Sequence, residues 1–144
     1  MDFNLYKKYT MKNFKLYTRW LIFNEKNQVL LVQKNDKQKI APWKNLFPWW
    51  SIEYKETPEQ ALKREIMEEV WLEVIDLELF DTKTMILWET HWLWVYYICK
   101  VKNLNFKNME PEKHKKVFWW GIWDLEKQTK EVLEKYILIN NKKK

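Results

Sequence analysis

Hydrophobic and polar residues follow each other along the chain in blocks whose length and spacing predict both strands and helices. Short apolar runs bounded by polar or turn-forming residues are typical of strands. Apolar residues that recur at every third or fourth position indicate a helix with one buried face. We predict strands at 15–23, 28–34, 73–84, 91–103 and 116–120, a short apolar segment broken by Pro48 at 46–53, and helices at 58–70 and 129–140.

The order of these elements predicts the fold class. Residues 24–27 are turn-forming, so the first two strands are expected to pair as a hairpin. Strands outnumber helices, which favours an α/β or α+β sandwich with a mixed sheet. No repeat, low-complexity tract or linker divides the chain. We therefore expect an N-terminal extension at 1–12, a single domain at 13–140 and a basic tail at 141–144.

Composition excludes some classes of protein. The longest apolar run, 92–99, is much shorter than the roughly 20 residues that span a bilayer. The N-terminus has no apolar core like that of a signal peptide, and the single cysteine, Cys99, suits a reducing compartment. These features predict a cytoplasmic protein without a membrane segment. The net charge of +6 could attract nucleotides or RNA, although a lysine-rich solvated surface explains it more simply.

The predicted helix at 58–70 begins with clear capping signals. Thr57 offers a side-chain oxygen to the first turn, and Pro58 occupies the first helical position. Gln60 stands three residues after Thr57 and completes a capping box. The start of this helix is therefore well specified by the sequence.

Three glutamates on this helix are the main candidates for chemistry. Glu65, Glu68 and Glu69 stand at i, i+3 and i+4, which places them on one face. Their like charges repel, and the neighbouring Lys63 and Arg64 can offset only part of this repulsion. Hard divalent cations such as Mg²⁺ and Mn²⁺ prefer oxygen ligands of this kind. Taken alone, the cluster is also consistent with a solvated acidic face of a surface helix.

The residues around these glutamates have a more specific spacing. The order is Trp50, five residues, Glu56, seven residues, Arg64-Glu65-Ile66, one residue, Glu68-Glu69, one residue, Trp71-Leu72. This pattern resembles the Nudix box, G-x5-E-x7-R-E-U-x-E-E-x-G-U, in which U is a bulky aliphatic residue. Seven of its nine specified positions match, and the two that do not are glycines in the family and tryptophans here.

The resemblance to the Nudix family extends over roughly residues 15–138. The strand at 28–34 and the Leu-Phe-Pro at 46–48 resemble the approach to the family's Pro-Gly-Gly turn. Residues 108–120 resemble a downstream glutamate-bearing loop followed by an aromatic strand. The resemblance implies an α/β/α sandwich with a mixed β-sheet between helices. It also implies Mg²⁺-dependent hydrolysis of a nucleoside diphosphate linked to another group.

Carried over by position, the resemblance assigns ligands for a metal ion. Glu65, Glu68 and Glu69 would bind Mg²⁺ or Mn²⁺, and one of them can serve as the general base. Glu112, in the downstream loop, is either a further ligand or base, as loop glutamates are in some members, or a solvated residue. No organic cofactor is expected.

Three other residues are assigned supporting or neutral roles. Glu56 is expected to orient the acidic cluster or the attacking water. Arg64 anchors the loop to the helix through a buried ion pair, unless it is a surface arginine. His114 is expected to be a surface loop residue without a catalytic role.

The leading prediction is a Nudix-type pyrophosphohydrolase that acts on a nucleoside triphosphate or modified nucleotide and releases pyrophosphate or phosphate. The alternative is a catalytically impaired Nudix-fold module that binds nucleotide or RNA or has a regulatory role. The set of glutamates favours the enzyme. RNA binding has no specific support in the sequence, and a monomer and a homodimer are equally consistent with it.

One feature of the composition does not fit the family. The chain has eleven tryptophans and one glycine, where an average chain of this length has about 10 glycines. Either the tryptophans are genuine and the protein is a strained or degenerate member, or UGA codons that the cell reads as glycine have been translated as tryptophan. The mass of the native protein separates the two explanations. Glycine would be unremarkable at Trp20, Trp43, Trp49, Trp50 and Trp71.

Overall fold

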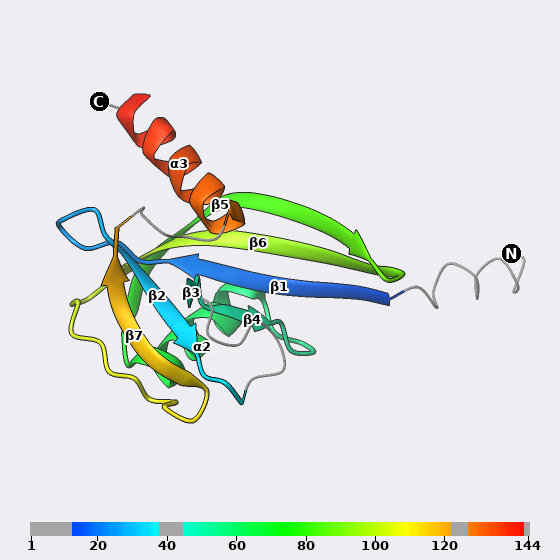
Figure 1. Cartoon of the computed structure of the whole chain (residues 1–144), viewed down its shortest axis with the longest axis horizontal. Coiled ribbons are helices and arrows are strands. Elements are labelled where there is room, and N and C mark those ends of the chain that lie inside the picture. Colours follow the sequence, from blue (N-terminus) through cyan, green and yellow to red (C-terminus); the bar gives the residue numbers. More distant parts are fainter. Residues whose placement is uncertain (1–12, 38–44, 122–126, 143–144) are drawn as a thin grey trace, which may run out of the picture.

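The computed structural model describes residues 13–37, 45–121 and 127–142, and in them a β-sheet layer lies between two helices (Figure 1). The expected α/β/α sandwich with a mixed sheet is confirmed. The predicted extension at 1–12 is outside the described residues. The elements are β1 (Asn13–Leu21), β2 (Val29–Lys34), β3 (Asn45–Leu46), β4 (Trp49–Ser51), α2 (Pro58–Val70), β5 (Val74–Leu87), β6 (Thr90–Val101), β7 (His114–Trp120) and α3 (Lys127–Lys142).

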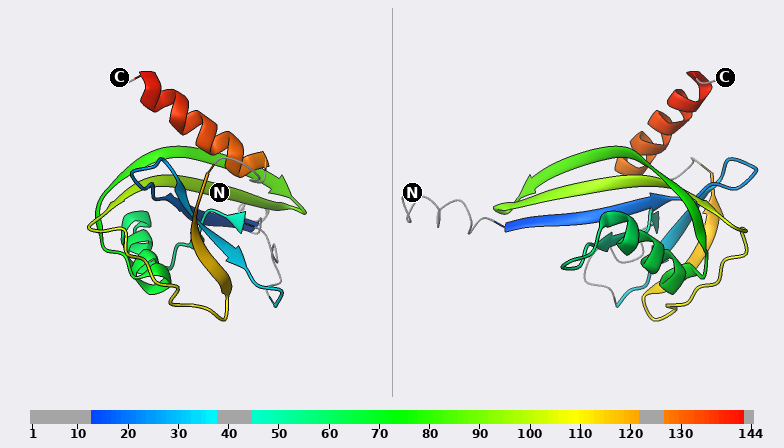
Figure 2. Two further views of the ribbon diagram at one scale, coloured as in Figure 1. Left: turned by 60° about the vertical axis from the view of Figure 1, so that its left-hand side comes forward. Right: turned by 180° about the vertical axis from the view of Figure 1, so that it is seen from behind.

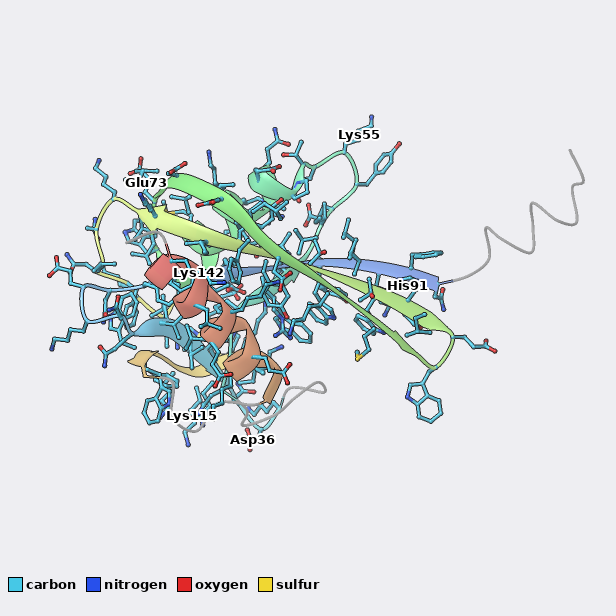
Figure 3. All side chains as sticks on the ribbon, turned by 90° about the horizontal axis from the view of Figure 1, so that it is seen from above. Asp36, Lys55, Glu73, His91, Lys115 and Lys142 are labelled. Atoms are coloured by element: carbon cyan, nitrogen blue, oxygen red, sulfur yellow. The ribbon has the colours of Figure 1, made fainter. Side chains whose placement is uncertain are left out.

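The strands form two sheets. The larger sheet has the order β4-β1-β6-β5, in which β1 is parallel to β6 and the other neighbours are antiparallel. The smaller sheet has the order β3-β2-β7 and is antiparallel. Strands β5 and β6 and the start of β1 extend beyond the smaller sheet (Figure 1). At this end His91, labelled in Figure 3, stacks on Phe14 with 5.1 Å between ring centroids.

The predicted hairpin between the first two strands is formed only next to its turn, and the strands then separate into different sheets. Strand β1 belongs to the larger sheet and β2 to the smaller one. The described contacts that join them directly include a bridge between Phe23 and Val29 and a hydrogen bond from the Leu30 N–H to the Ile22 carbonyl (2.9 Å). Residues 18–22 are all buried. The second half of β1 is therefore covered on both faces and runs through the core between β4 and β6, and the chain then crosses into the other sheet.

Two apolar clusters fill the space on either side of the sheet layer, and Figure 2 shows α2 and α3 on opposite sides of it. On the side of α2, Leu62, Ile66 and Val70 pack against residues of both sheets. On the side of α3, Leu133 packs against the alternate residues of the same strands. No helix in the described ranges is long and apolar enough to span a bilayer.

Helix α2 begins and ends as its sequence predicts. The Gln60 N–H donates to the Thr57 hydroxyl (3.1 Å) and the Thr57 N–H donates to the Gln60 side chain (3.0 Å), so the capping box is formed. At the other end Trp71 is left-handed, with φ 59° and ψ 37°, and its N–H donates to the Met67 carbonyl (3.1 Å). Helix α3 continues to Lys142, two residues into the predicted tail.

The backbone gives the tryptophans a physical context. Trp71 and Trp88 both have positive φ, 59° and 54°, whereas Gly121 does not. A left-handed residue with a Cβ costs roughly 1–2 kcal/mol, so glycine is favoured at these two positions. Trp20 is fully buried, and its indole Nε1 has no hydrogen-bond partner among the described residues. The backbone therefore favours glycine at positions 71 and 88, whereas Trp20 packs in the core and leaves only its N–H unsatisfied. Trp43 and Trp123 are outside the described residues.

The strain at position 71 can be measured with two variants. Trp71→Gly and Trp71→Ala both remove the same half-exposed indole. The difference between their free energies of unfolding therefore reports the cost of the left-handed backbone conformation for a residue with a Cβ atom. We expect Trp71→Gly to have a free energy of unfolding about 1 kcal/mol higher than Trp71→Ala, measured by urea denaturation. Equal stability of the two variants would show that the left-handed conformation carries no cost here.

Candidate active site

Helix α2 divides its three glutamates between two environments. Glu65 and Glu69, one turn apart, are 1% and 2% exposed and face the core. The side chain of Glu68 is 53% exposed. The helical spacing brings the three together on one side of α2, but only Glu65 and Glu69 are enclosed by the fold. The acidic cluster is therefore not simply a solvated face.

Arg64 links this cluster to the loop before the helix. Its Nε and Nη2 donate to the two Glu56 carboxylate oxygens at 2.8 and 3.0 Å, which is a bidentate pair. Its Nη1 donates to Glu65 and, at 3.3 Å, to Glu68, and Nη2 lies 3.7 Å from Glu53. The hydrogen bond from Arg64 lowers the pKa of Glu56, and the carboxylates raise the pKa of Arg64. One guanidinium thus holds carboxylates of the loop and of the helix in a fixed arrangement.

A third carboxylate reaches the buried pair from the loop after β6. The N–H groups of Lys107 and Met109 donate to the carbonyls of Val70 and Glu69, both at 2.9 Å. These bonds satisfy carbonyls at the C-terminal end of α2 and fix the loop against it. Glu110 follows directly and contributes to the electrostatic environment of Glu69 and Glu65.

The loop glutamate that meets the cluster is Glu110, whereas the sequence pointed to Glu112. Residues 110–113 form a turn in which the Lys113 N–H donates to the Glu110 carbonyl (2.9 Å). Asn108 supports this turn, because its side chain accepts from the Glu110 N–H (3.2 Å) and donates to the His114 carbonyl (2.8 Å). Glu112 is exposed, and its carbonyl accepts a hydrogen bond from the Asn35 side chain. Two glutamates flank Pro111, and spacing alone does not show which one the turn directs inward.

The expectation that His114 is a surface residue is wrong. His114 is 5% exposed, at the start of β7, where it pairs with Lys34 of β2. Burial, followed by the charges of Lys34 and Lys113, lowers its pKa to about 4, so the ring is neutral near pH 7. The apolar pattern predicted a strand that begins at residue 116 and so left His114 in the preceding loop. In the structure β7 begins two residues earlier, at His114.

Three carboxylate oxygens in this cluster are buried without a hydrogen-bond partner among the described residues. They are the Oε2 atoms of Glu65, Glu69 and Glu110. Burial, then the charges of Glu110 and Glu65, raises the pKa of Glu69 to about 8. Burial likewise raises the pKa of Glu65 to about 7, although Arg64 acts against this. Buried carboxylates without partners are costly, and a positive charge close to these three oxygens would reduce that cost.

A hard divalent cation fits this donor set, because it prefers carboxylate oxygens. Among the described residues no three His, Cys, Asp or Glu side chains already form a ligand set. The side chains of Glu65, Glu69 and Glu110 would therefore have to close on the ion. The positive charges of Lys113 and Lys34 also act on Glu69 and partly oppose the rise in its pKa.

Comparison with known proteins gives the class of this chain. Residues 15–140 match the model of the NUDIX domain family, and the chain belongs to that family. The 8-oxo-dGTP diphosphatase of Haemophilus influenzae is 39% identical over 61 residues, which are 42% of this chain and 44% of that protein. The 8-oxo-dGTP diphosphatase of Proteus vulgaris is 38% identical over 63 residues, 43% of this chain and 54% of that protein.

The chain thus spans about half the length of the curated relatives it matches. The crystal structure of a MutT NUDIX hydrolase from Burkholderia pseudomallei has a TM-score of 0.74 and covers 85% of this chain and 98% of that one. Its sequence is 20% identical, so this likeness shows a shared fold.

The cost of the buried carboxylates predicts a pH-dependent gain in stability for Glu69→Gln. In the presence of a chelator, the Glu69 carboxyl has a pKa of about 8 in the folded protein and 4.5 in the unfolded chain. Between these pH values the folded protein holds a proton that the unfolded chain has released. Stability of the parent protein should therefore fall as pH rises from about 4.5 to about 8. Above pH 8 the variant should be more stable by about 2 kcal/mol or more, measured by urea denaturation. Glu68→Gln, on the exposed side, is the control, and a pH-independent difference for Glu69→Gln would contradict the assignment.

Proposed function

We propose that this protein is a Mg²⁺-dependent Nudix pyrophosphohydrolase that hydrolyses the diphosphate of a nucleotide. The observation that carries the proposal is the set of buried, unpartnered oxygens of Glu65, Glu69 and Glu110. A buried carboxylate charge is costly unless a cation pairs with it, and a bound divalent ion would supply that pair. Mn²⁺ has the same preference for oxygen ligands and is the expected substitute.

Each residue of the cluster has a proposed role. Glu65, Glu69 and Glu110 hold the divalent cation, and Glu110 takes the place that the sequence suggested for Glu112. When bound, the ion would neutralise charge on the diphosphate and polarise its bonds to phosphorus. Glu68, at the exposed side of the helix, borders the same site. One of the α2 glutamates accepts the proton of the attacking water.

Two basic residues support the proposal without binding metal. Arg64 keeps the loop carboxylates Glu53 and Glu56 on the helix and so positions the α2 glutamates. The ammonium of Lys34, half-buried on β2, is close enough to Glu69 to affect its pKa. A lysine beside the carboxylates can bind a phosphate oxygen of the substrate. Lys34 is therefore proposed to orient the diphosphate.

The proposed substrate is a nucleoside triphosphate or a modified nucleotide. Both curated relatives are named 8-oxo-dGTP diphosphatase, which makes the oxidised purine nucleotide the first substrate to test.

A second candidate function is nucleotide or RNA binding without hydrolysis. The observation in its favour is that indoles cover two of the basic residues. The Lys34 ammonium lies 4.5 Å from the Trp49 ring centroid, and that of Lys113 lies 5.0 Å from the Trp50 ring centroid. If these tryptophans are genuine, they narrow access to the carboxylates from β4.

A pyrophosphate-release assay on a nucleotide panel tests the enzyme directly. The panel holds the common nucleoside triphosphates, 8-oxo-dGTP, ADP-ribose and a nucleotide sugar, with Mg²⁺ or with chelator. We expect turnover only with Mg²⁺, and a loss of about 10³-fold or more in Glu69→Gln because a metal ligand is removed.

The matched control is Glu73→Gln. Glu73 follows α2, pairs with Lys102 and has no contact with the cluster, so its variant should retain activity. Full activity of Glu69→Gln, or turnover in chelator, would refute the assigned role.

A further inference from the structure

Lys113 stands out because it is a cation placed inside the carboxylate cluster. Its Nζ donates to Glu110 Oε1 at 3.1 Å, and its charge also acts on Glu69. Arg64, by contrast, contacts Glu65 and Glu68 of α2. The ammonium of Lys113 is therefore the group that contacts the loop carboxylate from within the site.

The backbone of Lys113 is fixed by hydrogen bonds, whereas its partly exposed side chain is held by Glu110 and by the Trp50 ring, whose centroid lies 5.0 Å from Nζ. Its N–H donates to the Glu110 carbonyl (2.9 Å), and its own carbonyl accepts from the Asn35 N–H (3.1 Å). These two bonds tie the residue to its turn and to the end of β2. Its side chain is 39% exposed. The ammonium can therefore leave Glu110 for solvent by side-chain rotation, without movement of the loop.

An ammonium and a divalent cation compete for the same oxygens. Glu110 has one oxygen paired with Lys113 and the other buried without a partner. A cation that draws Glu110 toward Glu69 changes the position of the oxygen that Lys113 holds. It also brings a second positive charge close to the ammonium, and like charges at short range repel.

We propose that Lys113 is the resident counter-cation of Glu69 and Glu110, which a divalent ion must displace, so that Lys113 sets the affinity of the site for metal. The inference rests on the proposed function in one respect, namely that these carboxylates bind a cation. In this proposal Lys113 positions the carboxylates and does not itself bind the metal ion. In the metal-free protein Lys113 offsets the repulsion between the carboxylates, and in the loaded protein its contact with Glu110 is lost.

This proposal predicts two effects of opposite sign in Lys113→Met. The variant keeps an unbranched side chain of nearly the same length and removes the charge. The metal-free protein should unfold at a lower temperature, since the ion pair with Glu110 is gone. The same variant should bind Mg²⁺ about fivefold more tightly, because no ammonium has to be displaced. A lysine with a merely structural role would give the first effect without the second.

The experiment is thermal unfolding across a series of Mg²⁺ concentrations, from which the dissociation constant of the ion is obtained. Lys113→Gln removes the charge and keeps a hydrogen-bond donor, so it should show the same tightening even if Lys113→Met folds poorly. Lys113→Arg restores the charge and should return the affinity toward that of the parent. Lys102→Met removes a lysine paired with Glu73, which Figure 3 shows at the periphery, and should leave the affinity unchanged.

The outcomes separate this inference from the proposed function. If the parent protein shows no Mg²⁺-dependent shift, the cation site itself is refuted. If the parent binds Mg²⁺ and the two charge-removing variants bind it equally or more weakly, the role of Lys113 as counter-cation is overturned.

Discussion

Burial of the Glu65 and Glu69 carboxylates is the constraint on which the rest of the site depends. Both side chains are almost fully enclosed, and each has an oxygen without a partner among the described residues. The surrounding contacts serve to hold α2 in the position that encloses them. Arg64 binds the preceding loop to the helix, and the loop after β6 donates to the carbonyls of Val70 and Glu69. In the proposed function, a bound cation would relieve the cost of burying these carboxylates.

Local signals in the sequence predicted the helices and most strands, because they depend on neighbouring residues. The limits of α2 follow from Thr57, Pro58 and the left-handed position at 71. The predicted hairpin forms only next to its turn, and it does not extend along the strands for a non-local reason. Strand β1 pairs with β4 and β6. Neither the turn at 24–27 nor the apolar pattern of the strand predicts this pairing, because both are local.

The sequence predicted the helical half of the site more fully than the loop half. Box spacing alone placed Arg64 and the α2 glutamates, since helical periodicity fixes which residues share a face. Glu110 and the burial of His114 depend on how one turn is hydrogen-bonded to α2 and to Asn35, which spacing does not encode. The role of Lys113 likewise arises from that turn. The conflict of Trp71 with a left-handed position at the end of α2 follows from the sequence, whereas that of Trp88 is visible only once φ is known.

A crystal structure of the protein soaked in Mn²⁺, with anomalous scattering data, tests the central claim most directly. The account predicts a Mn²⁺ peak at roughly 2.0–2.2 Å from carboxylate oxygens of Glu65, Glu69 and Glu110. It also predicts that Lys113 has left Glu110 in that structure. A peak bound only by the exposed side chains of Glu53 and Glu68, or the absence of any peak at α2, would contradict the account.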